Sequence, residues 1–230
     1  MDTPLVSFLL PTRGNPEWLK ECVDSLVKHS TGEHSYEILL GIDDDDAETL
    51  ALFPALQDLL SEAWVLKVII SPRRGYSRLQ DYYNDLASIS SGQLLALWND
   101  DVVMLSPMWD FYLAQELAEG GLTPYLMWLP QELPLPPHVV FGGFPIIHRK
   151  AYEAMGHFSQ SPLNDRYLHD VMGKWAGLGD RSYLSRVCIR HDNAHADTRI
   201  DKPLLDEHHE ATIQNHIIAD REALSKNGLL

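Results

Sequence analysis

The stretch Leu94-Leu95-Ala96-Leu97-Trp98-Asn99-Asp100-Asp101-Val102 indicates both the fold and the place of the functional site. Its apolar half has the length of a buried strand, and an amide and two adjacent carboxylates follow it. In open α/β sheets, ligands bind at the carboxyl ends of the strands. Two neighbouring carboxylates repel each other unless a cation or a proton lies between them, and Mg²⁺ and Mn²⁺ prefer oxygen ligands and bridge to diphosphates. The stretch therefore predicts a metal–diphosphate site at the edge of a parallel sheet.

The first half of the chain alternates strand and helix patterns. The predicted strands cover residues 6–10, 36–42, 65–70 and 93–98. The helical patterns between them cover residues 16–27, 49–60 and 77–90. The first helix has Asn15 as its expected N-cap and Pro16 at its first position. Strands separated by helices indicate right-handed crossovers and a mostly parallel sheet, so the polar residues at the strand ends should meet at one edge.

The second half of the chain is less regular. Residues 123–137 are rich in Pro, Leu and Trp and are expected to form an extended loop or lid over the site. Gly142-Gly143, between apolar runs, predicts strands with a close backbone approach. The other expected elements are helices over residues 107–119, 149–155, 168–176 and 207–225 and a strand over residues 187–190.

Composition limits the classes of partner. The chain has 230 residues, of which 45% are hydrophobic and 22% are charged, with a net charge of −15. This charge argues against a broad electrostatic contact with nucleic acid or with an anionic membrane. The two cysteines, Cys22 and Cys188, lie in apolar patterns and are expected to be buried rather than paired. No leader pattern and no apolar run of membrane-spanning length is visible, so a cytoplasmic protein is expected.

Short polar motifs follow the predicted strands in a fixed order. In the first half they are Pro11-Thr12-Arg13, Asp43-Asp44, Arg74-Gly75, Asn84, Gly92 and Asn99-Asp100-Asp101-Val102. Further along they are Gly143-Phe144, His148-Arg149-Lys150-Ala151-Tyr152, Gly156-His157-Phe158 and His169-Asp170. Together, over roughly residues 5–192, this order resembles the glycosyltransferases of the GT-A fold, and family 2 in particular.

The resemblance implies one α/β domain over residues 1–230, with a mostly parallel central sheet flanked by helices. A nucleotide-binding half would span about residues 1–104, an acceptor-side half about 105–200, and a C-terminal helix 201–230. The implied reaction moves a sugar from a nucleotide-diphosphate donor, expected to be a UDP-sugar, to a hydroxyl of a carbohydrate, lipid-linked or other acceptor, with inversion. Mn²⁺ or Mg²⁺ would carry part of the diphosphate charge, and a carboxylate would take the proton of the hydroxyl.

The resemblance also implies a metal site and a base. Asp101 matches the last Asp of the family's Asp-x-Asp pattern and is the expected metal ligand, with His191 as a second ligand. Asp170 is the expected catalytic base because His169-Asp170 occupies the place of the family's Glu-Asp pair. Asp165, in the loop before the expected helix, is the second choice for the base.

The donor contacts implied by the resemblance are Pro11, Thr12, Arg13, Asp43, Asp44, Arg74, Arg78, Asn99 and Asp100. An Asp after the second strand would accept a hydrogen bond from the base, and Asp43 is the first candidate. An Arg can grip a phosphate through two parallel hydrogen bonds. Alternatively, the Arg cluster at residues 73–78 forms ion pairs with the acids at 43–46 that open when nucleotide binds. Asp45 and Asp46 are expected to begin a solvated helix.

Two departures from the family pattern keep other functions open. Asn99 stands where the pattern has its first Asp, and His169 stands where it has Glu. They are compatible with a non-catalytic module that binds a nucleotide sugar. A nucleotidyltransferase on a similar sheet would need a glycine-rich phosphate loop after the first strand, and residues 11–15 are poor in glycine.

Overall fold

A computed structural model describes residues 3–119, 126–128, 144–172, 182–184, 186–192 and 207–229 of the chain. Most of the Pro-rich stretch, Gly142-Gly143 and residues 173–176 of a predicted helix lie outside these residues. Among the described helices, none combines the length and the apolar composition that a membrane span requires.

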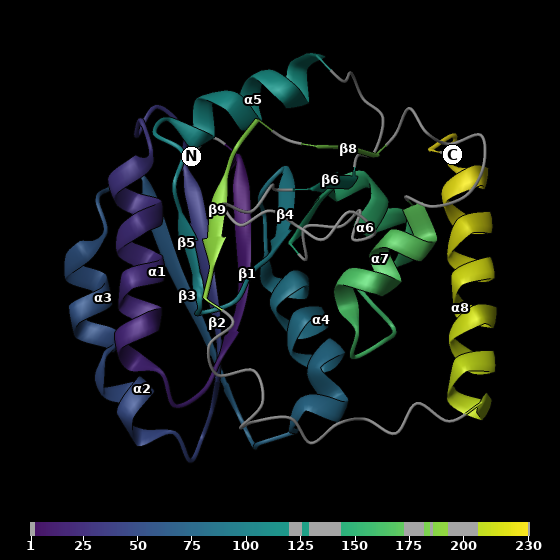
Figure 1. Ribbon diagram of the computed structural model, residues 1–230, viewed down its shortest axis with the longest axis horizontal. Coiled ribbons are helices and arrows are strands. Elements are labelled where there is room, and N and C mark those ends of the chain that lie inside the picture. Colours follow the sequence, from purple (N-terminus) through teal and green to yellow (C-terminus); the bar gives the residue numbers. More distant parts are fainter. Residues whose placement is uncertain are drawn as a thin grey trace.

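A sheet of seven described strands forms the centre of the molecule (Figure 1), in the order β3-β2-β1-β4-β7-β6-β8. The strands are β1 (Val6–Thr12), β2 (Tyr36–Asp43), β3 (Trp64–Ser71), β4 (Leu94–Leu97), β6 (Leu126–Trp128), β7 (Pro145–His148) and β8 (Ser182–Leu184). Strands β1 to β4 are mutually parallel, whereas β7 runs antiparallel to β4 and β6. The predicted α/β class and mostly parallel sheet are therefore confirmed.

The register of the parallel strands brings their polar ends together. On β1, Leu9 pairs with Leu39 of β2 and with Leu97 of β4. Since these strands run in the same direction, the residues after Leu97 and the last residue of β1, Thr12, lie at the same edge of the sheet. This edge, the carboxyl edge, carries the motifs of the first half of the chain.

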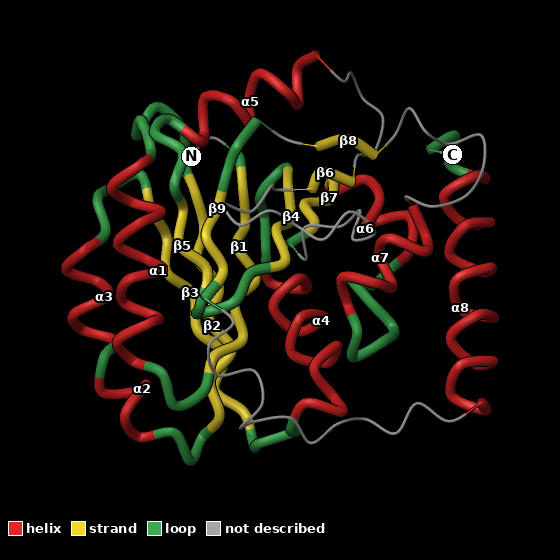
Figure 2. The backbone as a smooth tube through the Cα atoms, in the orientation of Figure 1, coloured by secondary structure: helices red, strands yellow, loops and turns green. Residues whose placement is uncertain are grey.

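Helices cover both faces of the sheet (Figures 1 and 2). They are α1 (Pro16–His29), α2 (Ala47–Ala51), α3 (Phe53–Leu59), α4 (Leu79–Ile89), α5 (Trp109–Glu119), α6 (Arg149–Met155), α7 (Asn164–Met172) and α8 (Glu207–Lys226), with a short 3₁₀ turn η1 (Tyr76–Arg78). Helices α1 and α3 pack together on one side, and α4 packs on β1 and β2 from the other. The outermost helix, α8, packs on α6 and α7.

Two predicted helices have different bounds in the structure. The helix expected over residues 49–60 is interrupted at Leu52, and Pro54 lies in the first turn of the second piece, where its missing N–H costs least. The helix expected to begin at Leu168 begins at Asn164 instead. Asp165 therefore lies in its first turn, and Asp170 lies beyond its middle.

A small second sheet was not predicted in full. Strand β5 (Val102–Met104) pairs antiparallel with β9 (Ile189–His191), and Val102 pairs with His191. The last predicted strand is thus present, but its partner β5 has only three residues and gives little periodic signal. The pairing joins residues that are far apart in the sequence.

The core on the α1 side of the sheet is aromatic. Phe8 lies at its centre, with its ring centroid 5.0 Å from that of Trp98 and 5.4 Å from that of Trp109, both edge to face. Tyr36 and Trp64 complete the cluster at a centroid distance of 4.5 Å. Such pairs stabilise beyond their buried area, so the cluster fixes β1, β2 and β3 against α5.

A buried carboxylate on β2 connects this strand to β1, to β3 and to the loop that follows α4. Glu37 is 2% exposed and accepts hydrogen bonds from Ser7 Oγ at 2.5 Å, Lys67 Nζ at 2.5 Å and Ser91 N at 2.7 Å. Burial raises the pKa of Glu37, but these hydrogen bonds outweigh it and lower the pKa to about 2. Gly92 is required beside them, because a Cβ there would lie 2.7 Å from the backbone N of Ser7.

This network predicts that the stability of the fold decreases in acid. A carboxyl whose pKa falls from its ordinary value of 4.5 to about 2 on folding stabilises the fold above pH 4.5, and the stabilisation is lost as the pH falls toward 2. It amounts to about 3 kcal/mol. In urea unfolding, Glu37→Gln should be less stable than the wild type at pH 7, and the difference should narrow at pH 3. Glu17→Gln, on the exposed side of α1, is the control; a difference independent of pH would contradict the prediction.

Candidate functional site

The carboxyl edge joins β1 to the acidic segment that follows β4. Thr12 is the last residue of β1, and its hydroxyl donates to Asp100 Oδ2 at 2.7 Å. Asn15 does not cap α1 with its side chain; its amide nitrogen lies 3.5 Å from the same Asp100 oxygen. These contacts hold the Asp100 carboxylate against the end of β1, where a nucleotide ribose is expected.

Asp101 and His191 meet through the small second sheet. The backbone N–H of Asp192 donates to the Asp101 carbonyl at 3.0 Å, which extends the β5–β9 ladder to the acidic segment. As a result, His191 Nε2 lies 3.2 Å from Asp101 Oδ2. The other carboxylate oxygen, Asp101 Oδ1, is buried and accepts no hydrogen bond within the described part of the chain. An unpaired buried carboxylate oxygen is costly, and either a hydrogen-bond donor or a cation would satisfy it.

The donor atoms at Asp101 suit a divalent cation. Two ligands in adjacent octahedral positions around Mg²⁺ or Mn²⁺ lie about 3 Å apart, and the separation of His191 Nε2 from Asp101 Oδ2 is close to that value. Among the described residues, no three or more His, Cys, Asp or Glu side chains could hold a metal ion by themselves. The remaining ligands would have to come from a bound diphosphate or from water.

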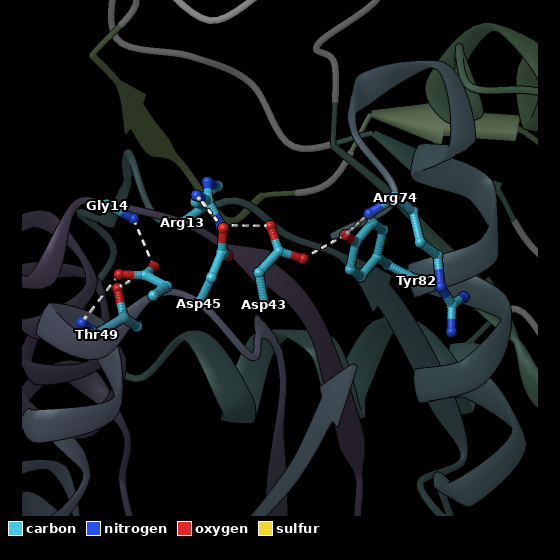
Figure 3. A network of polar contacts seen from close by, with 8 residues as sticks. Arg13, Gly14, Asp43, Asp45, Thr49, Arg74 and Tyr82 are labelled. Atoms are coloured by element: carbon cyan, nitrogen blue, oxygen red, sulfur yellow. Dashed lines mark hydrogen bonds and ion pairs between the residues drawn. The ribbon is translucent and has the colours of Figure 1, made fainter. Parts of the chain in front are cut away.

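Asp43, the last residue of β2, is buried at the same edge (Figure 3). Arg13 Nη1 donates to Asp43 Oδ2 at 2.9 Å, and Arg13 also forms an ion pair with Asp45. Asp44 is exposed and bonds only through its backbone to Ser71 O in the contacts described. Of the two candidates for base recognition, Asp43 and Asp44, Asp43 is thus the carboxylate that the fold orients.

Asp46 corrects one expectation. It is 7% exposed rather than solvated, because it is the N-cap of α2 and accepts from the backbone N of Thr49 at 3.2 Å. The backbone N–H of Gly14 also donates to it at 2.7 Å. Burial opposes the charge, but the hydrogen bonds from Thr49 and Gly14 outweigh it and lower the pKa of Asp46. The residue therefore connects the β1 and β2 loops.

The Arg cluster after β3 does not pair with the acids at 43–46. Arg74 Nη2 lies 2.6 Å from Asp85 Oδ2, and Arg78 Nη2 lies 2.5 Å from Asp81 Oδ2, both on α4. The expected ion pair across the strand ends is instead made by Arg13. In this arrangement the Arg74 side chain is directed along α4, away from Asp43 (Figure 3). Contact of Arg74 or Arg78 with a phosphate would require these exposed pairs, which contribute little, to open.

A cavity of about 170 Å³ lies beside the acidic segment. Its apolar and aromatic wall consists of Tyr76, Leu79, Tyr83, Leu97, Phe144 and Pro162. Its polar wall consists of Asn99, Asn164, Asp165 and His191. Tyr83 OH lies 2.9 Å from Asn99 Oδ1 and 3.0 Å from the Trp98 carbonyl oxygen, two acceptors for its single proton. An apolar wall with a few oriented polar groups is typical of a small-molecule site.

The two candidate bases lie in different places. Asp165 lines the cavity with Asn99 and His191, and burial raises the pKa of its carboxyl. Asp170 lines a separate hollow between α7 and α8. Its carboxylate lies 3.6 Å from Arg166 Nε, one helical turn away. The structure brings Asp165, the second choice from the sequence, to the cavity, and it places Asp170 among the residues that face α8.

Two tyrosines of α4, which the sequence motifs do not include, contribute to the candidate site. Tyr82 and Tyr83 match the inward face of α4, and both are buried. The hydroxyl of Tyr82 donates to Asp43, and that of Tyr83 contacts Asn99. The available signal was the residue type, since a buried Tyr usually finds a partner for its hydroxyl. Burial, with a further contribution from the bond to Asp43, raises the pKa of Tyr82, so the phenol stays a donor.

Asn84, a motif residue on α4, holds the loop that leads to Asp165. Its Oδ1 accepts from the backbone N of Phe158 at 2.8 Å and of Ser159 at 3.0 Å, and its Nδ2 donates to Ser159 O at 2.7 Å. One side chain therefore satisfies three backbone groups of this loop. From there the chain continues to Pro162 and into the first turn of α7.

Comparison with solved structures identifies the fold. TarS 1–349 from S. aureus, solved in complex with UDP-GlcNAc, matches with a TM-score of 0.65 at 12% identity, over 94% of this chain and 66% of that one. Mannosyltransferase PcManGT from Pyrobaculum calidifontis, solved with GDP-Man and Mn²⁺, matches with a TM-score of 0.61 at 13% identity, over 99% and 76%. Glucosyl-3-phosphoglycerate synthase from Mycobacterium tuberculosis gives 0.60 at 14%, over 99% and 81%. The chain has the GT-A fold.

The same comparisons set the limits of the likeness. The chain spans 33% of a longer TarS chain that it also matches. No family model and no curated protein sequence matches it.

The role of Asn84 can be tested by stability. Asn84→Ala would leave the buried N–H groups of Phe158 and Ser159 without their acceptor, which should lower the free energy of unfolding by about 2–3 kcal/mol. Gln115→Ala, whose amide contacts only the exposed Glu119 in the described contacts, should change it by less than about 0.5 kcal/mol. Urea unfolding measures both. Hydrogen exchange should also accelerate at residues 158–159, and unchanged protection there would show that the loop does not depend on Asn84.

Proposed function

We propose that this chain is a glycosyltransferase that moves a sugar from a nucleoside diphosphate donor to an acceptor hydroxyl. The observation that carries the proposal is the pairing of Asp101 with His191 beside a cavity at the carboxyl edge of a GT-A sheet. Structural neighbours solved with UDP-GlcNAc or with GDP-Man and Mn²⁺ support a nucleotide-sugar donor. We propose UDP as the nucleotide, as the resemblance of the motifs implies.

The donor would lie along the carboxyl edge. Asp43 supplies an oriented acceptor for an N–H of the base, and the β1 end at Pro11-Thr12 supplies the neighbouring wall. Asp100 and Asn99 would bond ribose hydroxyls. Arg13, which already lies over the acids, and the Arg74 and Arg78 guanidinium groups would balance the negative charge of the diphosphate.

Asp101 and His191 would hold Mn²⁺ or Mg²⁺. When bound there, such a cation supplies charge neutralisation for the diphosphate leaving group. The unpaired Asp101 Oδ1 supports this role, because a cation would satisfy it. The β5–β9 ladder holds the backbones of the two residues side by side before a cation binds.

Asp165 is the better-placed general base. It lines the cavity, whereas Asp170 lines the hollow near α8. A carboxylate that accepts the proton of the attacking hydroxyl must be ionised, and a raised pKa makes it a stronger base. One direct displacement, with Asp165 opposite the leaving group, would invert the anomeric centre.

A non-catalytic module of the same fold is the second candidate. Asn99 favours it, because it replaces an acid of the family pattern and its amide contacts Tyr83. A module would bind the donor without releasing the nucleoside diphosphate. Metal-dependent release of UDP from a UDP-sugar therefore separates the two candidates.

Donor and metal binding can be tested by thermal shift. UDP-, GDP-, CMP- and dTDP-sugars are each added with and without Mn²⁺, since a ligand that binds only the folded state raises the Tm. We expect at least one donor, with a UDP-sugar foremost, to raise the Tm, and Mn²⁺ to increase the shift. In Asp101→Asn the part of the shift that depends on Mn²⁺ should disappear.

The control for this experiment is Asp24→Asn, the same substitution at an exposed position of α1. It should keep the full shift. No shift from any donor, with or without Mn²⁺, would refute the donor site. A shift that survives unchanged in Asp101→Asn would remove Asp101 as the ligand.

The choice of base gives a separate prediction. Asp165→Asn should keep donor binding and lower the transfer or donor-hydrolysis rate by about 10²-fold or more, whereas Asp170→Asn should keep a rate within a few-fold of the wild type. Since burial raises the pKa of Asp165, the rate of the wild type should fall on acidification at a pH above the ordinary Asp value of about 3.9. Rates measured from pH 4 to 8 check both points. A loss confined to Asp170→Asn would reverse the assignment.

A further inference from the structure

Tyr82 joins the base-side acid to the loop after β3. It lies on α4 and is 8% exposed. Its hydroxyl donates to Asp43 Oδ1 and accepts the backbone N–H of Arg74 at 2.8 Å. The Arg74 guanidinium carbon lies 5.2 Å from the centre of the Tyr82 ring. Figure 3 shows the resulting chain of contacts from Arg13 through Asp43 and Tyr82 to Arg74.

The donor and acceptor at each hydrogen bond of Tyr82 are fixed. A phenol has one proton, and the Arg74 N–H already donates to its oxygen. The proton of Tyr82 must therefore point at Asp43 Oδ1. Arg13 binds the other oxygen of the same carboxylate. With a donor on each side, the Asp43 carboxylate has one orientation before any ligand arrives, and its remaining lone pairs have fixed directions.

We propose that Tyr82 is a positioning residue for nucleotide-base recognition: through Asp43 it sets the direction from which a base N–H is accepted. The inference rests on the proposed function and extends it to a residue on the neighbouring helix. Preorganisation of this kind increases affinity, because a rotating carboxylate would lose freedom on binding. Without the hydroxyl, Asp43 keeps only the half-exposed Arg13 as a partner in the described contacts.

The same residue connects two parts of the donor site. Arg74 follows β3, and its backbone is held by Tyr82 while its side chain pairs with Asp85 at 2.6 Å. The loop proposed to contact the diphosphate is therefore fixed by the group that orients the base-side acid. A change in Tyr82 should affect base-dependent binding first, because the hydroxyl bonds the Asp43 carboxylate itself, whereas at Arg74 it bonds the backbone and not the guanidinium that would contact the phosphate.

The experiment compares ligands that differ only in the base. Calorimetric titrations with UDP, GDP and ribose 5-diphosphate, all with Mn²⁺, give for each protein the ratio of the Kd of the base-free ligand to that of the tighter nucleotide. In Tyr82→Phe this ratio should fall about tenfold, the size of one lost hydrogen bond to a charged group. The affinity for ribose 5-diphosphate should change less than about twofold.

Tyr36→Phe is a matched control. The Tyr36 hydroxyl also donates to a carboxylate, that of Asp110, and also accepts a backbone N–H, that of His34 at 3.3 Å. It lies in the aromatic core near the amino end of β2, away from the carboxyl edge. The two variants lose equivalent bonds, so Tyr36→Phe should lower the Tm and leave the ratio unchanged. Because the nucleotide and ribose 5-diphosphate are titrated into the same preparation, partial unfolding changes their apparent Kd values by the same factor and leaves the ratio unaffected.

A double variant tests whether Tyr82 acts through Asp43. Asp43→Ala should lower the ratio by itself, and the addition of Tyr82→Phe should lower it no further. An unchanged ratio in Tyr82→Phe, in a wild type that binds UDP or GDP, would overturn this inference and leave the proposed function standing. A further fall in the double variant would show that Tyr82 does not act through Asp43. Failure of the wild type to bind either nucleotide would overturn the proposed function and this inference together.

Discussion

The register of β1 between β2 and β4 is the constraint on which the rest of the structure depends. Leu9 pairs with Leu39 on one side and with Leu97 on the other, and all three are buried. A shift by one residue would turn every side chain of a strand to the opposite face, so the aromatic cluster and the Glu37 network resist it together. Thr12, Asp43 and the acidic segment after β4 therefore lie at one edge because the core fixes where their strands end.

The acids at this edge differ in the hydrogen-bond donors that surround them. Asp43, Asp46 and Asp100 have hydrogen-bond donors around them from the β1 loop, from α2 or from α4. Asp101 is different, because one of its buried oxygens lacks a donor within the described residues and its nearest partner is an imidazole. The fold thus supplies hydrogen-bond donors to most of the buried acids at this edge, and among the described residues it leaves Asp101 with a carboxylate oxygen that has none.

Local signals in the sequence predicted the parallel sheet and the edge where the polar motifs collect, because apolar runs and the residues that end them lie within a few positions of each other. They did not predict that the helix at Asn164 begins early enough to put Asp165 beside the cavity. They also did not predict that Arg13, rather than Arg74 or Arg78, would pair with the acids after β2. Both outcomes depend on distances between elements that periodicity does not encode. The roles of the individual site residues stay predictions.

The β5–β9 pairing also affects the order in which the parts of the molecule can form during synthesis. Residues 6–97 supply the four parallel strands, whereas His191 reaches Asp101 only after about ninety further residues have been made. Contacts between such distant positions form late, because closing a long loop costs entropy before the contact repays it. A growing chain would thus complete its four parallel strands before Asp101 and His191, the proposed cation ligands, could meet, and ion uptake at that position would report a late stage of maturation.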